Sequence, residues 1–211
     1  MQIKNMQLGM IGTNCYIFWA DGSDRCAVVD PGDDGQQVAN LIQGLKLTPV
    51  AILLTHSHFD HVLGIPGLRE TWPDLPVYCH PADIPENVSE TMFGMTVPTV
   101  AAFGNITPYN EGDTVAIGPL TVKVIHTPGH TKGSVTLMVE GESVLFTGDT
   151  LFRGSMGRTD LPGGSYTDLT ASLKKLAALP GDYKVYPGHE GFSSLDNERK
   201  TNFFMQEAMK S

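Results

Sequence analysis

The segment His56-Ser57-His58-Phe59-Asp60-His61 places three histidines and an aspartate within six residues. It follows the apolar run 51–55, which has the length and composition of a buried strand. Because side chains alternate along an extended chain, the first two histidines would point the same way and could bind one cation. The aspartate and the third histidine come just afterwards and could face a second cation. Packing alone gives no reason for such a cluster, so the segment predicts a metal site at a strand end.

Four residues cannot fill two metal shells, and three further candidates follow later predicted strands. His130, Asp149 and His189 each come one to a few residues after a strand and directly after a glycine that lets the backbone turn. Strand ends can hold ligands on rigid supports while the mouth stays open. The complete candidate set is His56, His58, Asp60, His61, His130, Asp149 and His189.

Three other polar residues lie near predicted strand ends. Asp30 follows the apolar pair Val28-Val29, and it could orient a ligand histidine from behind or simply cap a turn. The sequence leaves both roles open. His80 and His126 are left outside the metal set, and we assign His126 to a strand and to ordinary packing.

The pattern of short apolar segments and turns predicts an α/β fold. Predicted strands cover residues 14–19, 25–30, 50–55, 113–117, 121–126, 134–140, 143–147 and 183–186, and predicted helices cover 36–45, 166–179 and 196–209. Strand-rich halves that are each followed by helices suggest two mixed sheets packed face to face with helices outside. Residues 83–110, which include Met92, Phe93, Met95 and Phe103, are predicted to form a helix-plus-loop excursion that packs on the core or walls a pocket.

Length and charge limit the functional classes. The 211 residues suit a single domain over 1–211, and the formal charge of −9 argues against a nucleic-acid or anionic-membrane partner. We expect no signal peptide at the start and no apolar run long enough to cross a bilayer. Three widely spaced cysteines, Cys15, Cys26 and Cys79, fit buried free thiols in a reducing cytoplasm.

The H-x-H-x-D-H motif, followed in order by His130, Asp149 and His189, resembles the metallo-β-lactamase superfamily. The resemblance covers nearly the whole chain, from about residue 14 to residue 202. It implies a four-layer αββα sandwich of two mixed β-sheets with a two-metal site along one edge. It also implies one metal on His56, His58 and His130, a second on Asp60, His61 and His189, and Asp149 as the bridge between them.

Nitrogen and oxygen ligands without sulfur fit Zn, Fe or Mn, and we take Zn first with Fe or Mn as alternatives. Two such cations sharing a water would lower its pKa from about 15.7 towards about 7, which provides hydroxide at neutral pH. One cation can also polarise a carbonyl oxygen. The implied reaction is hydrolysis of an acyl or phosphoryl bond.

Residue differences within the motif narrow the choice among the branches of the superfamily. True β-lactamases of the superfamily lack a bridging aspartate at the place of Asp149, and the flavin-linked diiron branch has glutamate at the place of His58. The nucleic-acid-processing branches usually carry extra domains or exosites, which do not fit a short acidic chain. The remaining branch is glyoxalase II (hydroxyacylglutathione hydrolase), and residues 187–209 look like the ending of its short bacterial type. Glyoxalase II has a lysine and a tyrosine on glutathione where this chain has Arg158 and Asp160, so the cation is retained and the tyrosine is not.

A thioester suits the site because its thiol leaving group, with a pKa of about 8.5, needs no strong general acid. We therefore expect a small-molecule thioester substrate such as S-lactoylglutathione, with glutathione as the candidate thiol carrier. Arg158 is the candidate for pairing with a substrate carboxylate, whereas Arg153 is assigned to the surface or to bracing its loop. Asp60 could shuttle a proton in addition to serving as a ligand.

Two other readings stay open. Persulfide dioxygenases share the fold and a Gly-Arg-Thr-Asp stretch like residues 157–160, but they hold one iron through the equivalents of His56, His130 and Asp149. A non-catalytic metal-binding module is less favoured, because loss of activity would leave gaps among the ligands. The sequence does not indicate an oligomeric state.

Overall fold

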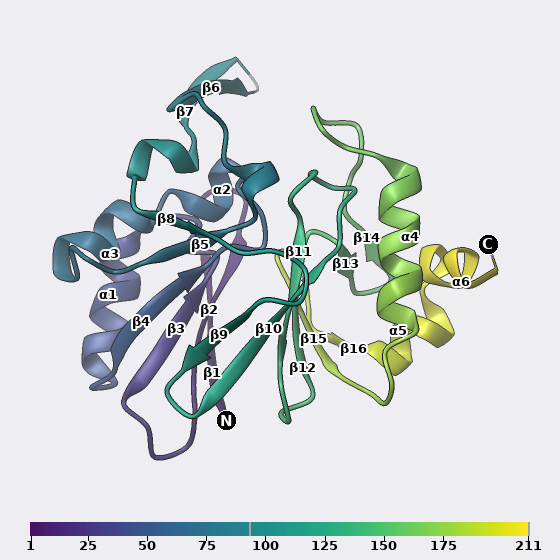
Figure 1. Cartoon of the computed structure of the whole chain (residues 1–211), viewed down its shortest axis with the longest axis horizontal. Helices are drawn as coiled ribbons and strands as arrows, with labels where there is room; N and C mark the ends of the chain where they lie inside the picture. The colour runs from purple at the N-terminus through teal and green to yellow at the C-terminus, as the bar shows by residue number, and fades with distance from the viewer. Residues whose placement is uncertain (93, 211) are drawn as a thin grey trace.

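A computed structural model of the chain describes residues 1–92 and 94–210. Two six-stranded sheets pack face to face, and helices cover their outer faces (Figure 1). The first sheet has the strand order β1 (Gln2–Leu8), β2 (Thr13–Trp19), β3 (Arg25–Val29), β4 (Thr48–Leu53), β5 (Val77–Cys79), β8 (Ile106–Pro108). The second has the order β16 (Ser193–Ser194), β15 (Lys184–Pro187), β12 (Val144–Gly148), β11 (Val135–Val139), β10 (Leu120–His126), β9 (Thr114–Ile117).

The helices divide between the two outer faces. Beside the first sheet lie α1 (Gly35–Gly44), α2 (Phe59–Val62) and α3 (Ile65–Thr71), and beside the second lie α4 (Tyr166–Ala177), α5 (Leu195–Thr201) and α6 (Phe203–Lys210). Both sheets are mixed, because β3, β4, β5 and β8 run parallel in the first, and β12 and β15 run parallel in the second. The predicted four-layer αββα arrangement is confirmed.

Alternation along the strands builds three apolar layers. On β2, Tyr16 and Phe18 point between the two sheets, whereas Cys15 and Ile17 point to the layer under α1 and α3. Burying one such large side chain contributes about 1.5–3 kcal/mol. A third layer joins the second sheet to α4, α5 and α6, with Leu173 of α4 at its centre. Both faces of each sheet are therefore covered by packed side chains, so a functional site can form only at the ends of the strands.

Cys15, Cys26 and Cys79 are free and buried, as predicted, and burial raises the pKa of each thiol. Among the described residues, no helix is long and apolar enough to cross a membrane.

The single C-terminal helix predicted over 196–209 is wrong. The chain forms two helices, α5 and α6, because Asn202 between them adopts an extended backbone. The buried Asn202 amide donates to the Ser155 carbonyl at 2.9 Å, and its Oδ1 accepts from the backbone N–H of Phe204 and Met205 at the start of α6. Asparagine at such a position caps the new helix, which ends the first one.

The prediction of a helix within residues 83–110 is also wrong. After a 3₁₀ turn at Pro81–Asp83, the segment forms the hairpin of β6 (Ser89–Met92) and β7 (Met95–Pro98), a second 3₁₀ turn at Val100–Phe103, and the edge strand β8. Val100 and Phe103 pack on the first core, and Met92 lines a cavity. Phe93 lies outside the described residues.

Several of the strands were not predicted, including the edge strand β1 and a small pair that follows Asp149. β1 is an edge strand whose mostly polar sequence gives no apolar alternation, although it pairs with β2 over its whole length. A second small pair, β13 (Leu151–Phe152) and β14 (Ser155–Met156), folds the segment after Asp149 back on itself. In Figure 1 this pair and the β6–β7 hairpin lie on either side of the edge where the strand ends of both sheets meet.

Candidate metal centre

All seven predicted ligands meet at one edge of the sandwich. His56 and His58 follow β4, and Asp60 and His61 lie on the short helix α2. The second sheet supplies the rest from the segments after β10, β12 and β15, namely His130, Asp149 and His189. Residues separated by more than 130 positions in the chain thus lie within a few ångströms of one another.

The first group of ligands is formed by three imidazoles. The ligand nitrogens of His56, His58 and His130 lie within 4.8 Å of one another. Nε2 of His130 lies 2.9 Å from Nδ1 of His58, and the three ring centroids are 4.7–4.8 Å apart. His56 is buried, whereas His58 lines the open side. The three rings surround a point that suits a cation with nitrogen ligands.

The second group combines a carboxylate with two imidazoles. Oδ2 of Asp60 lies 3.6 Å from Nε2 of His61 and 3.3 Å from Nε2 of His189. Asp149 lies between the groups, because its Oδ1 is 3.6 Å from His61 while its Oδ2 is 3.5 Å from both His130 and His189. One carboxylate therefore faces both ligand groups with different oxygens.

Unpartnered buried atoms show that the residues fit bound cations. Within the described part of the chain, Nε2 of His56, both ring nitrogens of His61 and Oδ1 of Asp149 are buried without a hydrogen-bond partner. Leaving a buried polar atom unpaired costs about 1–3 kcal/mol, so a cluster of them calls for a ligand. Divalent cations bind this mixture of imidazole and carboxylate donors.

The protonation states of His56, His58 and Asp60 also suit metal binding. Burial, and then the neighbouring His130, lower the pKa of His58 to about 4, and burial with the adjacent histidines lowers the pKa of His56 strongly. Burial disfavours the charged form of Asp60, but the His189 and His61 contacts outweigh it and hold the pKa of that carboxyl well below its usual range. Neutral imidazoles and an ionised carboxylate are the forms that bind cations.

Asp30 lies behind two of the histidines. Its Oδ2 is 3.0 Å from Nδ1 of His61 and accepts the Thr55 hydroxyl at 2.6 Å, while its Oδ1 accepts the Thr55 N–H at 2.8 Å. That hydroxyl is 3.2 Å from Nδ1 of His56. Burial works against a charged His61, but the Asp30 carboxylate raises its pKa to about 9. The geometry favours the orienting role over the turn cap, although Asp30 also sits at φ 48° where the chain leaves β3.

His130 is oriented by a backbone group. Its Nδ1 donates to the Arg158 carbonyl at 2.8 Å, which leaves Nε2 facing His58 and Asp149. The exposed Arg158 guanidinium pairs with both oxygens of Asp160 at 2.7 and 2.8 Å. The cation assigned to substrate binding is thus already partnered by Asp160.

Sequence reasoning missed Asp83, a buried carboxylate that joins the two loops of the first ligand group. Its oxygens accept the Thr131 hydroxyl at 2.6 Å, the Gly133 N–H at 2.7 Å and the Ser57 N–H at 3.3 Å. Burial, which comes first among the causes, raises its pKa in spite of these donors. A Cβ on Gly133 would lie 2.5 Å from the Asp83 carboxyl carbon, so glycine is required there. No sequence signal near Asp83 marked this contact between distant loops.

The His189 loop is held by β2. The Asn14 amide donates to the Pro187 and Glu190 carbonyls at 3.1 and 3.0 Å, and the Tyr16 hydroxyl donates to the Pro187 carbonyl at 2.6 Å. Gly188 is needed for close approach rather than for a positive φ, because a Cβ there would lie 2.3 Å from Oδ1 of Asp149.

His80 and His126 do not join the centre. Their rings stack at a centroid distance of 4.2 Å, and Nε2 of His126 lies 2.9 Å from the Lys132 carbonyl.

The centre opens into a cavity of about 340 Å³. Apolar side chains line much of its wall, from Ile11, Met92, Phe152, Met156 and Leu161. His58, Asp60, His130, Asp149 and His189 form its floor, and Arg158 lies at the wall. A small substrate can therefore reach the ligand groups from solvent.

Comparisons with known proteins agree with this geometry. The family profile of the metallo-beta-lactamase superfamily matches residues 8–189, and the chain belongs to that superfamily. Two curated relatives are a probable metallo-hydrolase, YqgX of Bacillus subtilis, and the hydroxyacylglutathione hydrolase GloC of Haemophilus influenzae. They are 38% and 30% identical, and each alignment covers 97% of this chain and 98% of the relative.

Solved structures place the chain in the same superfamily. BLEG-1 B3 metallo-beta-lactamase has a TM-score of 0.85 at 34% identity, covering 97% of this chain and 99% of that one. TTHA1623 in a di-iron-bound form has a TM-score of 0.83 at 38% identity, with 95% and 99% covered. ETHE1 from Myxococcus xanthus has a TM-score of 0.77 at 25% identity, with 99% and 90% covered. The chain is thus a metallo-hydrolase of the superfamily, and the resemblance to glyoxalase II-like members is confirmed.

Proposed function

We propose that the protein is a dinuclear, metal-dependent thioesterase of glyoxalase II type that hydrolyses an S-2-hydroxyacylglutathione such as S-lactoylglutathione. The observation that carries the proposal is the pair of complete ligand groups with Asp149 between them. The relative named hydroxyacylglutathione hydrolase GloC supports the acyl and carrier class. Zn is our first choice of metal, with Fe or Mn as alternatives.

The proposed ligands are His56, His58 and His130 for one metal, Asp60, His61 and His189 for the other, and Asp149 for both. Bound cations would supply hydroxide at neutral pH and would polarise the thioester carbonyl. Asp30 and the Arg158 carbonyl hold His61 and His130 in the orientation that this requires. Asp60, which accepts the Thr13 hydroxyl at 3.0 Å, has a second proposed role as a proton shuttle.

The chain's own residues also shape the mouth. Ile11, Phe152 and Met156 would exclude water from the acyl group, and Arg158 would pair with a substrate carboxylate. Because Asp160 already holds that guanidinium, a substrate must compete for it. Both groups are exposed, so such competition costs little.

A mononuclear persulfide dioxygenase is the alternative. It would use His56, His130 and Asp149 and would leave the second ligand group without a role. The 3.3 Å approach of His189 to Asp60, together with the buried unpartnered Nε2 of His61, favours the dinuclear hydrolase.

The test is the release of free thiol from S-lactoylglutathione by metal-replete protein. We expect rapid release that stops when a chelator is added. Nitrocefin serves as the β-lactam comparison, because a similar structure is named a B3 metallo-beta-lactamase. Absence of thiol release with two metals bound would contradict the proposal, and oxygen consumption with glutathione persulfide would replace it with the dioxygenase.

A further inference from the structure

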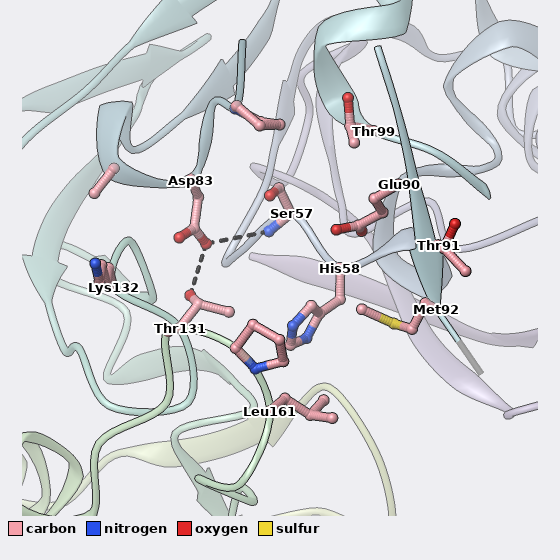
Figure 2. Close-up of a pocket in the computed structure, with 14 residues that line it drawn as sticks. Ser57, His58, Asp83, Glu90, Thr91, Met92, Thr99, Thr131, Lys132 and Leu161 are labelled. Atoms are coloured by element: carbon pink, nitrogen blue, oxygen red, sulfur yellow. Dashed lines mark hydrogen bonds between the residues drawn. The ribbon is translucent and has the colours of Figure 1, made fainter. Parts of the chain in front are cut away.

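A second, larger cavity adjoins the mouth of the metal centre. It has a volume of about 590 Å³, and His58, Met92 and Leu161 line both spaces (Figure 2). Small-molecule sites in proteins have volumes of about 300–1,000 Å³. A lactoyl group extends only a methyl beyond its hydroxyl-bearing carbon, so it is too small to fill both the mouth and this cavity.

The wall of the larger cavity is mainly apolar. Its hydrocarbon surface comes from Ala82, Pro85 and Pro162 in addition to the shared Met92 and Leu161. Because apolar surface gains free energy when it is removed from water, such a wall favours a ligand with a hydrocarbon part. The shared residues make the apolar surface continuous with the mouth, where a substrate enters.

Two buried threonines of this wall use their hydroxyl groups within the protein. The Thr131 hydroxyl donates to Asp83 at 2.6 Å, and the Thr99 hydroxyl donates to the Asn87 carbonyl. Figure 2 shows the Thr131 hydroxyl turned toward Asp83 and the methyl group turned away from it. Neither hydroxyl proton is free for a ligand, so these threonines add to the apolar character of the wall.

Two exposed charged side chains also border the cavity. Lys132 comes from the loop between β10 and β11, Glu90 comes from β6, and Figure 2 shows them on opposite sides of the view. The Lys132 stem runs past Gly163, because a Cβ on that glycine would lie 3.8 Å from Cγ of Lys132. Long charged side chains cover apolar surface with their methylenes and keep the charged end in water. The two charges are therefore compatible with an apolar ligand between them.

Arg158 indicates which end of a thioester the larger cavity receives. It lines the mouth and not the larger cavity, and it is our candidate for pairing with a substrate carboxylate. A lactoyl group has no carboxylate, so the group that pairs with Arg158 belongs to the thiol carrier. With the carrier at Arg158, the acyl group is the end that extends past His58 toward the larger cavity.

We propose that the larger cavity binds the hydrocarbon tail of the acyl group, so that the protein prefers 2-hydroxyacyl groups with a longer apolar tail than lactoyl. The inference rests on the proposed thioesterase function and adds the class of acyl group to it. Met92 and Leu161 form the passage, because they line both the mouth and the cavity that receives the tail.

Binding of the free 2-hydroxy acids tests the inference without turnover and without a thiol carrier. Titration calorimetry on the metal-loaded protein should give a Kd for 2-hydroxyoctanoate at least about tenfold below that for lactate, because burying each methylene lowers Kd by up to about fourfold. Ala82→Phe and Thr91→Phe, which enlarge two side chains that line only the larger cavity, should reduce this difference. Ala171→Phe is the matched control, since this exposed alanine of α4 lines neither cavity.

Kinetics separate this inference from the proposed function. With glutathione as the common carrier, kcat/KM for the 2-hydroxyoctanoyl thioester should exceed that for the lactoyl thioester, and Ala82→Phe should lower the ratio of the two. Hydrolysis of neither thioester by the wild type would refute the thioesterase proposal, and the acid titrations would still decide what the cavity binds. Equal Kd values for the two acids, no measurable binding of 2-hydroxyoctanoate, or a Kd ratio unchanged by both Ala82→Phe and Thr91→Phe would overturn the inference.

Discussion

The Asp30 carboxylate lies 3.0 Å from Nδ1 of His61 and, through the Thr55 hydroxyl, also reaches Nδ1 of His56. One buried acid from the end of β3 thus lies behind a histidine of each ligand group. Both imidazoles then present Nε2, and both Nε2 atoms are buried without a partner. The two proposed metal positions are therefore linked by two carboxylates. Asp149 faces both ligand groups directly, and Asp30 contacts a histidine of one group and reaches a histidine of the other through Thr55.

Asp30→Asn should lower metal affinity or activity by about 10- to 100-fold, because outer carboxylates that hold ligand histidines typically have effects of this size. The measurement is competitive metal titration followed by metal analysis. Asp34→Asn, an exposed helix cap away from the centre, is the matched control. Wild-type affinity in Asp30→Asn would show that Asp30 only caps a turn.

Asp149→Ala should empty at least one metal position and abolish turnover, because its two oxygens face both groups. Elemental analysis of the purified variant gives the metal count. The bridging role would be refuted by an active variant with a full metal complement.

Asp83→Asn should lower the free energy of unfolding by about 1–3 kcal/mol, since a buried backbone donor loses its acceptor. It should also weaken metal binding by His56, His58 and His130, which a purely structural role would leave unchanged. Gly133→Ala tests the same contact from the other side, because its Cβ would collide with Asp83. Denaturant titration and metal titration together are the measurements. Unchanged metal affinity in a folded Asp83→Asn protein would restrict Asp83 to the fold.

Arg158→Gln should raise KM for an anionic thioester by about three- to tenfold, because an exposed ion pair is lost, while its backbone carbonyl still holds His130. Asp160→Asn should lower KM, because it frees the guanidinium. The Arg158 hydrogen bonds lower the pKa of Asp160 to about 2, so this pair persists throughout the neutral range. The measurement is KM from steady-state kinetics, with Arg153→Gln as the control. Equal changes in KM for the two arginine variants would contradict a specific role for Arg158.

Metal binding should raise thermal stability. At a free metal concentration 1,000 times Kd the gain is about 4 kcal/mol, which corresponds to about 8–16 °C in Tm for a chain of this size. Differential scanning calorimetry with and without chelator measures it. A shift of the same size in Asp149→Ala would place the stabilising metal elsewhere.

The sequence by itself determined which residues could carry the chemistry and most of the elements that support them. Strand periodicity located β2, β4 and β10, and the density of histidines in 56–61 marked the centre, because local patterns record which side chains face a core and which do not. Edge strand β1 and the helix break at Asn202 were missed, since neither disturbs local periodicity.

Only the tertiary structure decided how these residues meet. Asp83 touches loops that lie 26 and 48 residues away, and Arg158 orients His130 through a carbonyl that every residue type possesses. The cavity between Lys132 and Glu90 exists because a hairpin of the first half lies opposite a loop of the second. Such contacts depend on the packing of two sheets, which no local pattern encodes.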